Sequence, residues 1–351
     1  MWWQSGLALR ALIRYLERTH NTEPVYQQLI ATTYRLNYNG PGLAGPHGQR
    51  FGNRYMDDTG WWALAWLEAA RYELADRGDV DAANRYLQAA EWDADYLYSR
   101  PRPCGGGGIE WRMGRSTNTI TNAEFISLAA QLAQMRAAPG PLQDRTAAWT
   151  WLSDAKQTLG WLQRSGLIDS ATGAVFGGYD RRCRPAGREL MYMGGEVADA
   201  FVQVGTAESD PSYYDKAAVF IDHVLDPSAG MLAGGVLQEQ CESRVGLCAG
   251  YSYNITVYKG LFVDAVTDWT AATLATRFDR FLRAQADAVI ADSASDGRQP
   301  ASCHTPHSCQ IGLYWSRRVD PLKAPIPITT GTQITGLTAL TAALALSPDA
   351  G

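Results

Sequence analysis

The chain lacks long apolar runs and blocks of basic residues. Its 351 residues carry a formal net charge of −5, and no apolar run reaches the ~18 residues that span a bilayer. We therefore expect no membrane span, and no nucleic-acid partner, since nucleic-acid-binding domains usually carry a clustered basic surface. A low-complexity linker is also missing, and a chain of this length with 46% hydrophobic residues can bury a large core. We expect one domain over residues 1–351.

Phenylalanine is scarce beside the other aromatic residues. The chain has 8 Phe, 12 Trp and 17 Tyr. Trp and Tyr combine a flat apolar face with a hydrogen-bonding group. Sugar rings, which have apolar CH faces and hydroxyl rims, fit such surfaces. Ordinary core packing also uses these residues, so the composition leaves both interpretations open.

The six cysteines include no C-x-x-C spacing, which disfavours a zinc site. Their even number and two close pairs favour disulfide bonds. The cysteines closest in sequence are predicted to pair, Cys241 with Cys248 and Cys303 with Cys309, leaving Cys104 and Cys183. Two alternatives stay open: six reduced thiols, or a Cys/His metal cluster that includes His304 and His307.

The predicted disulfides indicate an oxidising compartment, so we expect a secreted or cell-surface protein. The first residues, MWWQSGLALRALIRYLERTHN, lack the basic start and small-residue cleavage site of a signal peptide. We therefore expect that any signal peptide has been removed from this sequence.

Strand-like alternation is scarce, and apolar residues recur at three- and four-residue spacing, which predicts helices. Eleven segments show this spacing: 4–19, 22–36, 59–77, 79–99, 119–137, 146–164, 187–205, 211–224, 254–268, 271–291 and 331–346. Loops rich in glycine, proline and aromatics recur every 50 to 70 residues. This rhythm indicates an all-α fold, an (α/α)6 barrel of helical hairpins, with functional residues on the long loops at one face. An open α-solenoid is the alternative, but its shorter recurring repeats are missing.

Two adjacent acids, Asp57 and Asp58, precede Trp61 and Trp62 in the stretch MDDTGWW. At a helix start, adjacent side chains lie ~100° apart and can converge on one ligand. Retaining glycosidases need two carboxyl groups ~5–5.5 Å apart, and two close carboxyls also keep one proton between them. The alternative is that Asp58 or Thr59 caps the helix while Asp57 supports its dipole.

These motifs resemble glycoside hydrolase family 76, the family of endo-α-1,6-mannanases and related cell-wall transglycosidases. The likeness rests on MDDTGWWALAWLEA followed by CGGGGIEWRMGRSTNTITNAEFISLAAQLA. Asn118, Ile120, Asn122 and Phe125 fall on the family's Asn-x-Ile-x-Asn helix opening. Weaker echoes include VYKGLF, IGLYWSR and TGTQITGLTALTAAL, so the resemblance covers about residues 1–346.

The resemblance implies an (α/α)6 barrel that hydrolyses α-1,6-mannosidic links with retention and without a metal or organic cofactor. By position, Asp57 would be the nucleophile and Asp58 the acid/base. We therefore expect Asp57 to stay ionised and the raised pKa to belong to Asp58. The partner would be an oligosaccharide or polysaccharide, and we expect a monomer.

The chain departs from the family pattern around the expected substrate position. The usual Trp-Trp after the glycines is Glu110-Trp111, the Lys before Asn118 is Thr117, and the acid after Asn122 is Ala123. Two further motifs differ as well: Tyr-Asn-Gln-Gly is Tyr192-Met193-Gly194-Gly195, and a site-lining Asp-Gly is Gly177-Gly178, with Asp180 nearby. The catalytic pair is intact, so the sequence supports hydrolase chemistry more strongly than mannan specificity.

Eight candidates for substrate binding lie in or beside these motifs: Trp61, Trp62, Trp111, Asn118, Asn122, Tyr179, Asp180 and Tyr192. Each has a structural alternative: core packing for the aromatics, helix capping and buried hydrogen bonds for the asparagines, a solvated loop for Asp180. We expect a cleft at one end of the barrel lined by Trp62, Trp111 and Tyr179. Lys259, which lies among apolar residues, is expected to pair with a buried acid.

Two other functions remain open from the sequence. A transglycosidase, or a hydrolase of a different α-linked cell-wall glycan, would use the same acid pair. A non-catalytic helical scaffold would use its acids only to hydrogen-bond sugar.

Overall fold

The computed structural model describes residues 2–38, 51–100, 104, 107–114, 116–243, 248, 253–292, 310–316 and 326–346. Within these ranges the chain forms eleven α-helices: α1 (Trp2–Thr19), α2 (Pro24–Asn37), α3 (Met56–Ala75), α4 (Val80–Tyr98), α5 (Thr119–Ala137), α6 (Arg145–Arg164), α7 (Met191–Glu208), α8 (Ser212–Leu225), α9 (Tyr258–Thr273), α10 (Asp279–Asp292) and α11 (Thr330–Leu344). Among the residues that the structure describes, 3-10 helices span Pro227–Ala229, Gln240–Ser243 and Tyr253–Val257.

Each predicted segment overlaps one of these helices, and the largest differences lie at α9 and α10. Residues 254–257, predicted as α-helix, belong to a 3-10 helix. The prediction that α10 starts near 271 is wrong: α9 continues to Thr273, and Leu274 then turns the chain with a φ of 54°. Periodicity could not separate the two helices, because apolar residues continue through the turn.

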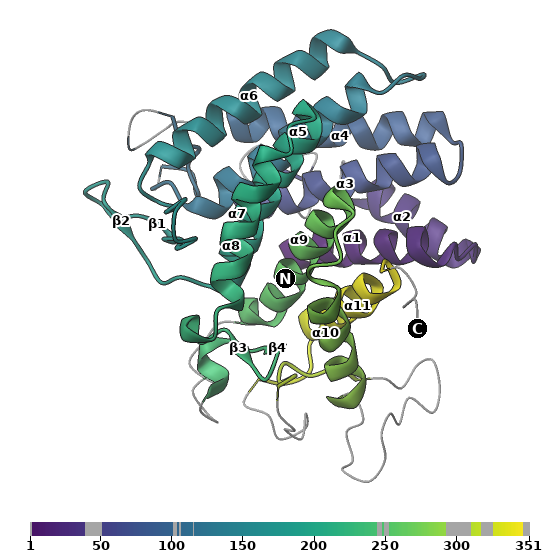
Figure 1. Cartoon of the computed structure of the whole chain (residues 1–351). Coiled ribbons are helices and arrows are strands. Elements are labelled where there is room, and N and C mark those ends of the chain that lie inside the picture. The colour runs from purple at the N-terminus through teal and green to yellow at the C-terminus, as the bar shows by residue number, and fades with distance from the viewer. Residues whose placement is uncertain are drawn as a thin grey trace.

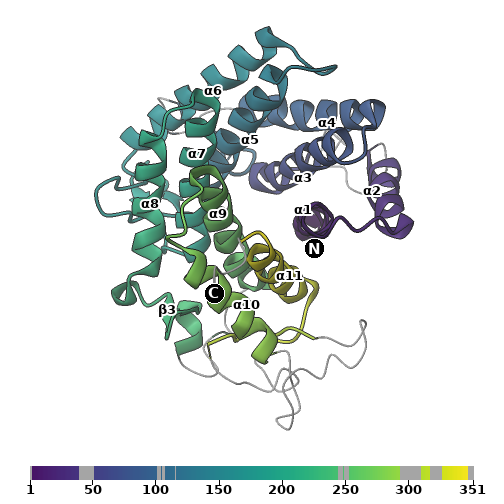
Figure 2. The same cartoon turned by 45° about the vertical axis from the view of Figure 1, so that its right-hand side comes forward.

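The odd-numbered helices form a closed inner ring. Each of α1, α3, α5, α7 and α9 contacts the next, and α11 contacts both α9 and α1. The even-numbered helices lie outside, as Figure 2 shows for α2, α4, α6 and α8 around the rim. This arrangement confirms the predicted (α/α)6 barrel, with six inner and five outer helices in the described part of the chain (Figure 1).

Inner and outer helices differ in burial because only the inner ones are enclosed on all sides. In α5, 16 of 19 residues are buried, and many of them are alanine. The outer helix α6 buries a narrower stripe that includes Trp151, Ala155, Leu159 and Leu162, the three- and four-residue spacing of an amphipathic helix. None of the described helices is both long and apolar enough to cross a membrane.

Two antiparallel hairpins extend the loops between helices. β1 (Gly178–Tyr179) pairs with β2 (Pro185–Ala186), and β3 (Leu232–Ala233) pairs with β4 (Val236–Leu237). These four strands of two residues each agree with the scarcity of strand patterns in the sequence.

Two disulfide bonds and one buried ion pair tie loops to the barrel. Cys241 pairs with Cys248, as predicted, and Cys104 pairs with Cys183. Cys303 and Cys309 lie outside the described residues, as does the alternative Cys/His cluster. Lys259 Nζ lies 2.6 Å from the buried carboxylate of Glu242, which confirms the expected structural role of this lysine.

Candidate active site

The acid pair lies in the first turn of α3, on a backbone fixed by a neighbouring loop. The segment before α3 pairs with residues 111–113: Tyr55 and Arg112 form a β-bridge, and Met56 N donates to Trp111 O at 2.8 Å. Met113 N donates to Arg54 O at 3.1 Å. Because these bonds join the segments on either side of Asp57, the loop after the glycines positions the start of the helix.

Each aspartate accepts a hydrogen bond from a side chain outside the pair. Trp111 Nε1 donates to Asp57 Oδ2 at 2.9 Å, and the backbone N–H of Asp58 donates to Asp57 Oδ1 at 3.0 Å. Asn53 Nδ2 donates to Asp58 Oδ2 at 2.8 Å, and Tyr96 Oη donates to the backbone oxygen of Asn53. Both carboxyl groups are therefore held in fixed orientations.

The helix-cap alternative does not describe this geometry. The N-cap residue of α3 is Tyr55, and no side chain caps the helix there. The Thr59 hydroxyl bonds to the backbone of Asn53 and Tyr55. Asp57 and Asp58 lie inside the first turn, where the helix dipole favours negative charge, but neither is the cap.

A cavity of about 360 Å³ opens beside the pair, at the end of the barrel where α3, α5, α7 and α9 begin. Its lining residues are Trp3, Tyr55, Asp57, Asp58, Trp61, Trp111, Ile120, Tyr192, Asn254 and Tyr258. Six of the ten are Trp or Tyr. They form three neighbouring pairs, with ring centroids 6.2 Å apart for Trp3–Trp61, 5.5 Å for Tyr55–Trp111 and 4.1 Å for Tyr192–Tyr258. The two acids thus face a cavity with aromatic walls.

Burial raises the pKa of both acids. The pKa of Asp57 rises to about 7, first through burial and then through the charge of Asp58, while the hydrogen bond from Trp111 opposes the rise. The pKa of Asp58 rises to about 6 through burial, opposed by the bond from Asn53. The pKa of Asp58 is thus raised as predicted, but the prediction that Asp57 would stay ionised is wrong, because burial and the charge of Asp58 raise the pKa of Asp57 further.

A third carboxyl group, Glu124 on α5, lies behind the pair. Its side chain is fully buried, and neither carboxyl oxygen has a hydrogen-bond partner among the described residues. Burial raises its pKa well above the usual range, and the charges of Asp57 and Glu196 raise it further. Gly60 leaves room for this side chain, because a Cβ there would lie 2.3 Å from Glu124 Oε2.

Among the predicted binding residues, Trp61, Trp111 and Tyr192 line the cavity. Trp62 instead lies in the core, where it is 2% exposed and packs against Phe51 and Trp66. It is therefore not part of the cleft wall for which it was predicted. Residues 61 and 62 point in directions ~100° apart on the helix, and α3 is rotated so that Trp61 faces the cavity while Trp62 faces the core.

The remaining candidates occupy supporting positions. Asn118 is the N-cap of α5 and accepts from Thr121 N, and the buried Asn122 bonds to both backbone groups of Ile109. Tyr179 Oη donates to Ser165 O. Asp180 accepts from Arg182 N and pairs with Arg184 in the β1–β2 turn. None of these four lines the cavity.

The sequence interpretation missed Trp3, Tyr55, Asn53 and Tyr258 as members of the site. Tyr55 and Asn53 immediately precede the acid pair, so their proximity was a usable signal. Trp3 and Tyr258 come from α1 and α9, far along the chain, and only closure of the ring brings them to Asp57.

Among the described residues, no group of three or more His, Cys, Asp or Glu side chains could hold a metal ion.

A family model described as Glycosyl hydrolase family 76 matches residues 1–348. The chain belongs to glycosyl hydrolase family 76. This membership confirms the family predicted from the acid pair and glycine motifs, and it places the protein among the glycoside hydrolases.

The similar proteins include curated sequences and solved structures. Mannan endo-1,6-alpha-mannosidase DCW1 of Candida glabrata is 24% identical over 176 residues, which cover 49% of this chain and 36% of that protein. The chain thus matches just over a third of the length of its curated relatives.

Two solved structures share the fold. Dfg5 of Chaetomium thermophilum, in complex with glucosamine, is 20% identical with a TM-score of 0.76, and the match covers 98% of this chain and 80% of that one. The α-1,6-mannanase GH76A of Salegentibacter sp. HEL1_6 was solved as an inactive variant, with two consecutive aspartates changed to asparagine, in complex with α-1,6-mannotriose. It is 19% identical with a TM-score of 0.70, covering 98% of this chain and 88% of that one.

Proposed function

We propose that the protein is a retaining, endo-acting glycoside hydrolase that cleaves α-1,6-mannosidic linkages in α-mannan-type polysaccharides. The observation that carries this proposal is the pairing of Asp57 and Asp58 in a cavity with aromatic walls, each held by a side-chain donor. The Salegentibacter relative supports it, because changing two consecutive aspartates gave a variant described as inactive that was solved with α-1,6-mannotriose.

In the proposed reaction, Asp57 is the nucleophile and Asp58 the acid/base. Trp111 and the amide of Asp58 hold both oxygens of Asp57, which fixes the carboxylate for attack on the anomeric carbon. As the bond from that carbon to the leaving oxygen breaks, Asp58 gives its proton to the oxygen. Asp58 then takes a proton from water, and the water oxygen attacks the same carbon. The bond from that carbon to Asp57 breaks, and the sugar product has the original anomeric configuration.

The reaction requires the proton to be on Asp58, although in this structure the pKa of Asp57 is the higher of the two. Coupled carboxyls titrate as a pair, so a bound sugar can decide which one holds the proton. A leaving-group oxygen beside Asp58 displaces water and stabilises its protonated form. Positive charge developing at the anomeric carbon stabilises the anion of Asp57.

The disulfides and aromatic walls fit an enzyme that acts on carbohydrate outside the cell. Disulfides such as Cys104–Cys183 persist in oxidising compartments, so we propose that the protein is secreted or held at the cell surface. Trp3, Trp61 and Trp111 offer apolar faces on which sugar rings can stack.

Incubation with unbranched α-1,6-mannan, α-glucan and lipomannan would test the substrate. We expect oligosaccharides of intermediate length from the mannan, and proton NMR at early times should show products that keep the α-configuration. An initial β-product would contradict retention. Products longer than the starting oligosaccharide would identify a transglycosidase instead.

Asparagine variants would test the two roles separately. Asp57→Asn and Asp58→Asn should both lose turnover of mannan while keeping the wild-type circular dichroism spectrum. With an activated aryl mannoside, which needs no acid to depart, Asp58→Asn should still form the glycosyl-enzyme, and added azide should accelerate its release. Asp57→Asn should form no covalent intermediate. Near-normal activity of Asp57→Asn would refute the assignment.

A further inference from the structure

A second cavity, of about 310 Å³, lies at the end of the barrel opposite the acid pair. Its walls come from the middle and C-terminal parts of the six inner helices, and the N-terminal ends of five of these, α1, α3, α5, α7 and α9, contribute to the first cavity. It contains no aromatic side chain, so it offers no stacking surface for a sugar ring. Its lining is instead rich in guanidinium, carboxyl and hydroxyl groups, a composition that the proposed hydrolysis does not use.

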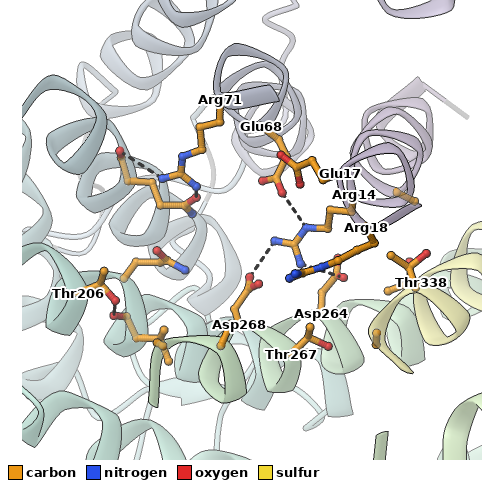
Figure 3. Close-up of a pocket in the computed structure, with 18 residues that line it drawn as sticks. Arg14, Glu17, Arg18, Glu68, Arg71, Thr206, Asp264, Thr267, Asp268 and Thr338 are labelled. Carbon is orange, nitrogen blue, oxygen red and sulfur yellow. Dashed lines mark hydrogen bonds and ion pairs between the residues drawn. The ribbon is translucent and has the colours of Figure 1, made fainter. Parts of the chain in front are cut away.

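The carboxylates of this cavity already have partners. Arg14 contacts three of them, Glu68 at 2.9 Å, Asp264 at 3.1 Å and Asp268 at 2.8 Å, and Figure 3 shows this cluster on one side of the cavity. Arg10, behind the wall, lies 3.6 Å from Asp268. These arginines compensate the buried negative charges, and the pKa values of both are raised despite burial.

Arg71, on α3, lacks such compensation. Its guanidinium group donates to the side-chain and backbone oxygens of Gln131, at 2.7 and 3.5 Å, and no carboxylate of a described residue lies within ion-pair distance of it. Figure 3 shows Arg71 set apart from the Arg14 cluster. Burial lowers the pKa of Arg71 below that of an ordinary arginine. The charges of Glu68 and Asp268 also act on Arg71, but neither carboxylate forms a direct ion pair with it, so its guanidinium group keeps donors that can bind an anion.

Arg18 adds a second unpaired positive charge at the exposed side of the same cavity. No carboxylate of a described residue pairs with it either. Glu17 also lines the cavity, but burial and the charge of Glu68 raise its pKa to about 8, so it is mostly neutral at pH 7. The lining therefore combines the guanidinium groups of Arg14, Arg18 and Arg71 with the carboxyl groups of Glu68, Asp264 and Asp268, and Arg10 adds a further guanidinium group behind the wall.

The helix C-termini that frame the cavity oppose an anion, because the macrodipole is negative there. This effect falls off within the last turn, and Arg71 and Gln131 lie more than a turn before the ends of α3 and α5. At Arg71 the dipole therefore opposes an anion only weakly, whereas Arg18 lies in the last turn of α1, where its own positive charge offsets the dipole. Arginine also binds carboxylate and phosphate with two parallel hydrogen bonds.

We propose that this second cavity binds a small oxyanion, a carboxylate or a phosphate ester that also carries hydroxyl groups, with the anionic group on Arg71 and Arg18. The hydroxyls of Thr206, Thr267 and Thr338 donate to backbone oxygens of their own helices, so their oxygens can accept hydrogen bonds from the ligand. A volume near 300 Å³ is at the lower end for small-molecule sites. This binding is independent of the proposed hydrolysis.

Calorimetry and thermal unfolding of the full chain, at constant ionic strength, would test the proposal with three probes. Glucose 6-phosphate supplies a phosphate ester, gluconate supplies a carboxylate, and glucose supplies hydroxyl groups alone. We expect at least one of the anions to bind with measurable heat and to raise the melting temperature in a saturable way, while glucose does neither. If neither anion binds, or if glucose binds as well as the anions, the proposal is wrong.

Variants locate the binding. Arg71→Met keeps the aliphatic stem and removes the charge, and it should raise the Kd of the bound anion at least tenfold. Arg77→Met, just beyond α3 and outside the cavity lining, is the matched control and should leave the Kd unchanged. If Arg71→Met does not fold, Arg18→Met at the exposed side should still raise the Kd severalfold. An unchanged Kd in the folded cavity variants would overturn the site.

Discussion

At the scale of single residues, the acid pair is controlled by opposing influences on its pKa values. Burial raises the pKa of Asp57, while the indole N–H of Trp111 lowers it. The sequence left Trp111 undecided between a sugar platform and a packing residue. The structure gives it a third role, as the donor that holds Asp57 Oδ2 at 2.9 Å, in addition to lining the cavity.

Trp111→Phe should separate these roles, because phenylalanine keeps an aromatic face and removes the donor. Loss of a hydrogen bond to a charged group costs about 1.5–3 kcal/mol, which predicts about a 10- to 100-fold fall in kcat/KM on mannan. Without the indole, the pKa of Asp57 should rise further, so the acidic limb of the pH–rate profile should move to higher pH. Trp149→Phe, on the exposed face of α6, is the control. An unshifted limb would contradict the role of Trp111.

The raised pKa of Asp57 also predicts a pH-dependent stability. Its pKa is 3.8 when unfolded and about 7 when folded, so its proton stabilises the folded state at low pH. That stabilisation is lost as the pH rises through about 7. Asp57→Asn cannot ionise, so its melting temperature relative to wild type should increase from pH 5 to pH 8. The corresponding change in the free energy of unfolding relative to wild type, after allowance for partial exposure of the side chain, should be on the order of 1–2 kcal/mol.

Asp180→Asn is the control for this measurement. Hydrogen bonds to the backbone N–H groups of Arg184 and Arg182 lower the pKa of Asp180, so its contribution to stability is already complete above pH 5. Its melting temperature relative to wild type should therefore be the same at pH 5 and pH 8. An equally flat result for Asp57→Asn would show that burial of Asp57 has little energetic effect.

The sequence predicted single residues of the site correctly where neighbours along the chain act together. It failed where the position of a side chain depends on how its helix is rotated about its axis. Adjacent carboxyls at a helix start are visible in the sequence, and the structure places Asp57 and Asp58 together at a cavity. The choice between Trp61 and Trp62 depends on how α3 is rotated in the ring. That rotation is set by the packing of α1 and α5 against α3, which no local pattern reports.

At the scale of elements, two glycines in the loop before α5, Gly107 and Gly108, are required by close packing. A run of glycines is typical of a turn or of a close approach of the backbone to another group. In the structure Gly107, with a φ of 140°, and Gly108 pack against the indole of Trp161 on α6. The partner could not be predicted, because Trp161 lies more than fifty residues further along the chain.

Gly108→Ala tests this packing. A Cβ at position 108 would lie 2.2 Å from Trp161 Cη2, and a buried indole ring cannot bend away. Overpacking of this kind typically costs about 1–3 kcal/mol, which urea denaturation would measure as a lower midpoint. Gly177→Ala is the matched control, because its nearest neighbours lie at an ordinary 3.6 Å. Equal stability of the two variants would show that the loop can move away from α6.

At the scale of the whole molecule, ring closure assembles the site, and it also determines the disulfides. The even spacing of helical segments was enough to predict an (α/α)6 barrel, because each hairpin has similar length. Cys104 and Cys183 were left over by spacing alone, since 79 positions separate them. They meet because the loop after α4 and the β1–β2 turn lie at the same end of the barrel, where Asn118 and Gly178 form a bridge.

The Cys104–Cys183 disulfide should therefore support the site as well as the fold. The chain-entropy model gives about 4.5 kcal/mol for its 79-residue separation and about 2.4 kcal/mol for the seven residues of Cys241–Cys248. Replacing each pair by serine, in separate variants, should lower the melting temperature more for the first pair. Loss of the first pair should also reduce kcat on mannan, because its loop continues into the segment that holds Trp111 against Asp57. Equal melting temperatures and equal kcat values in the two variants would show that the barrel alone fixes this loop, with the bond adding nothing to either property.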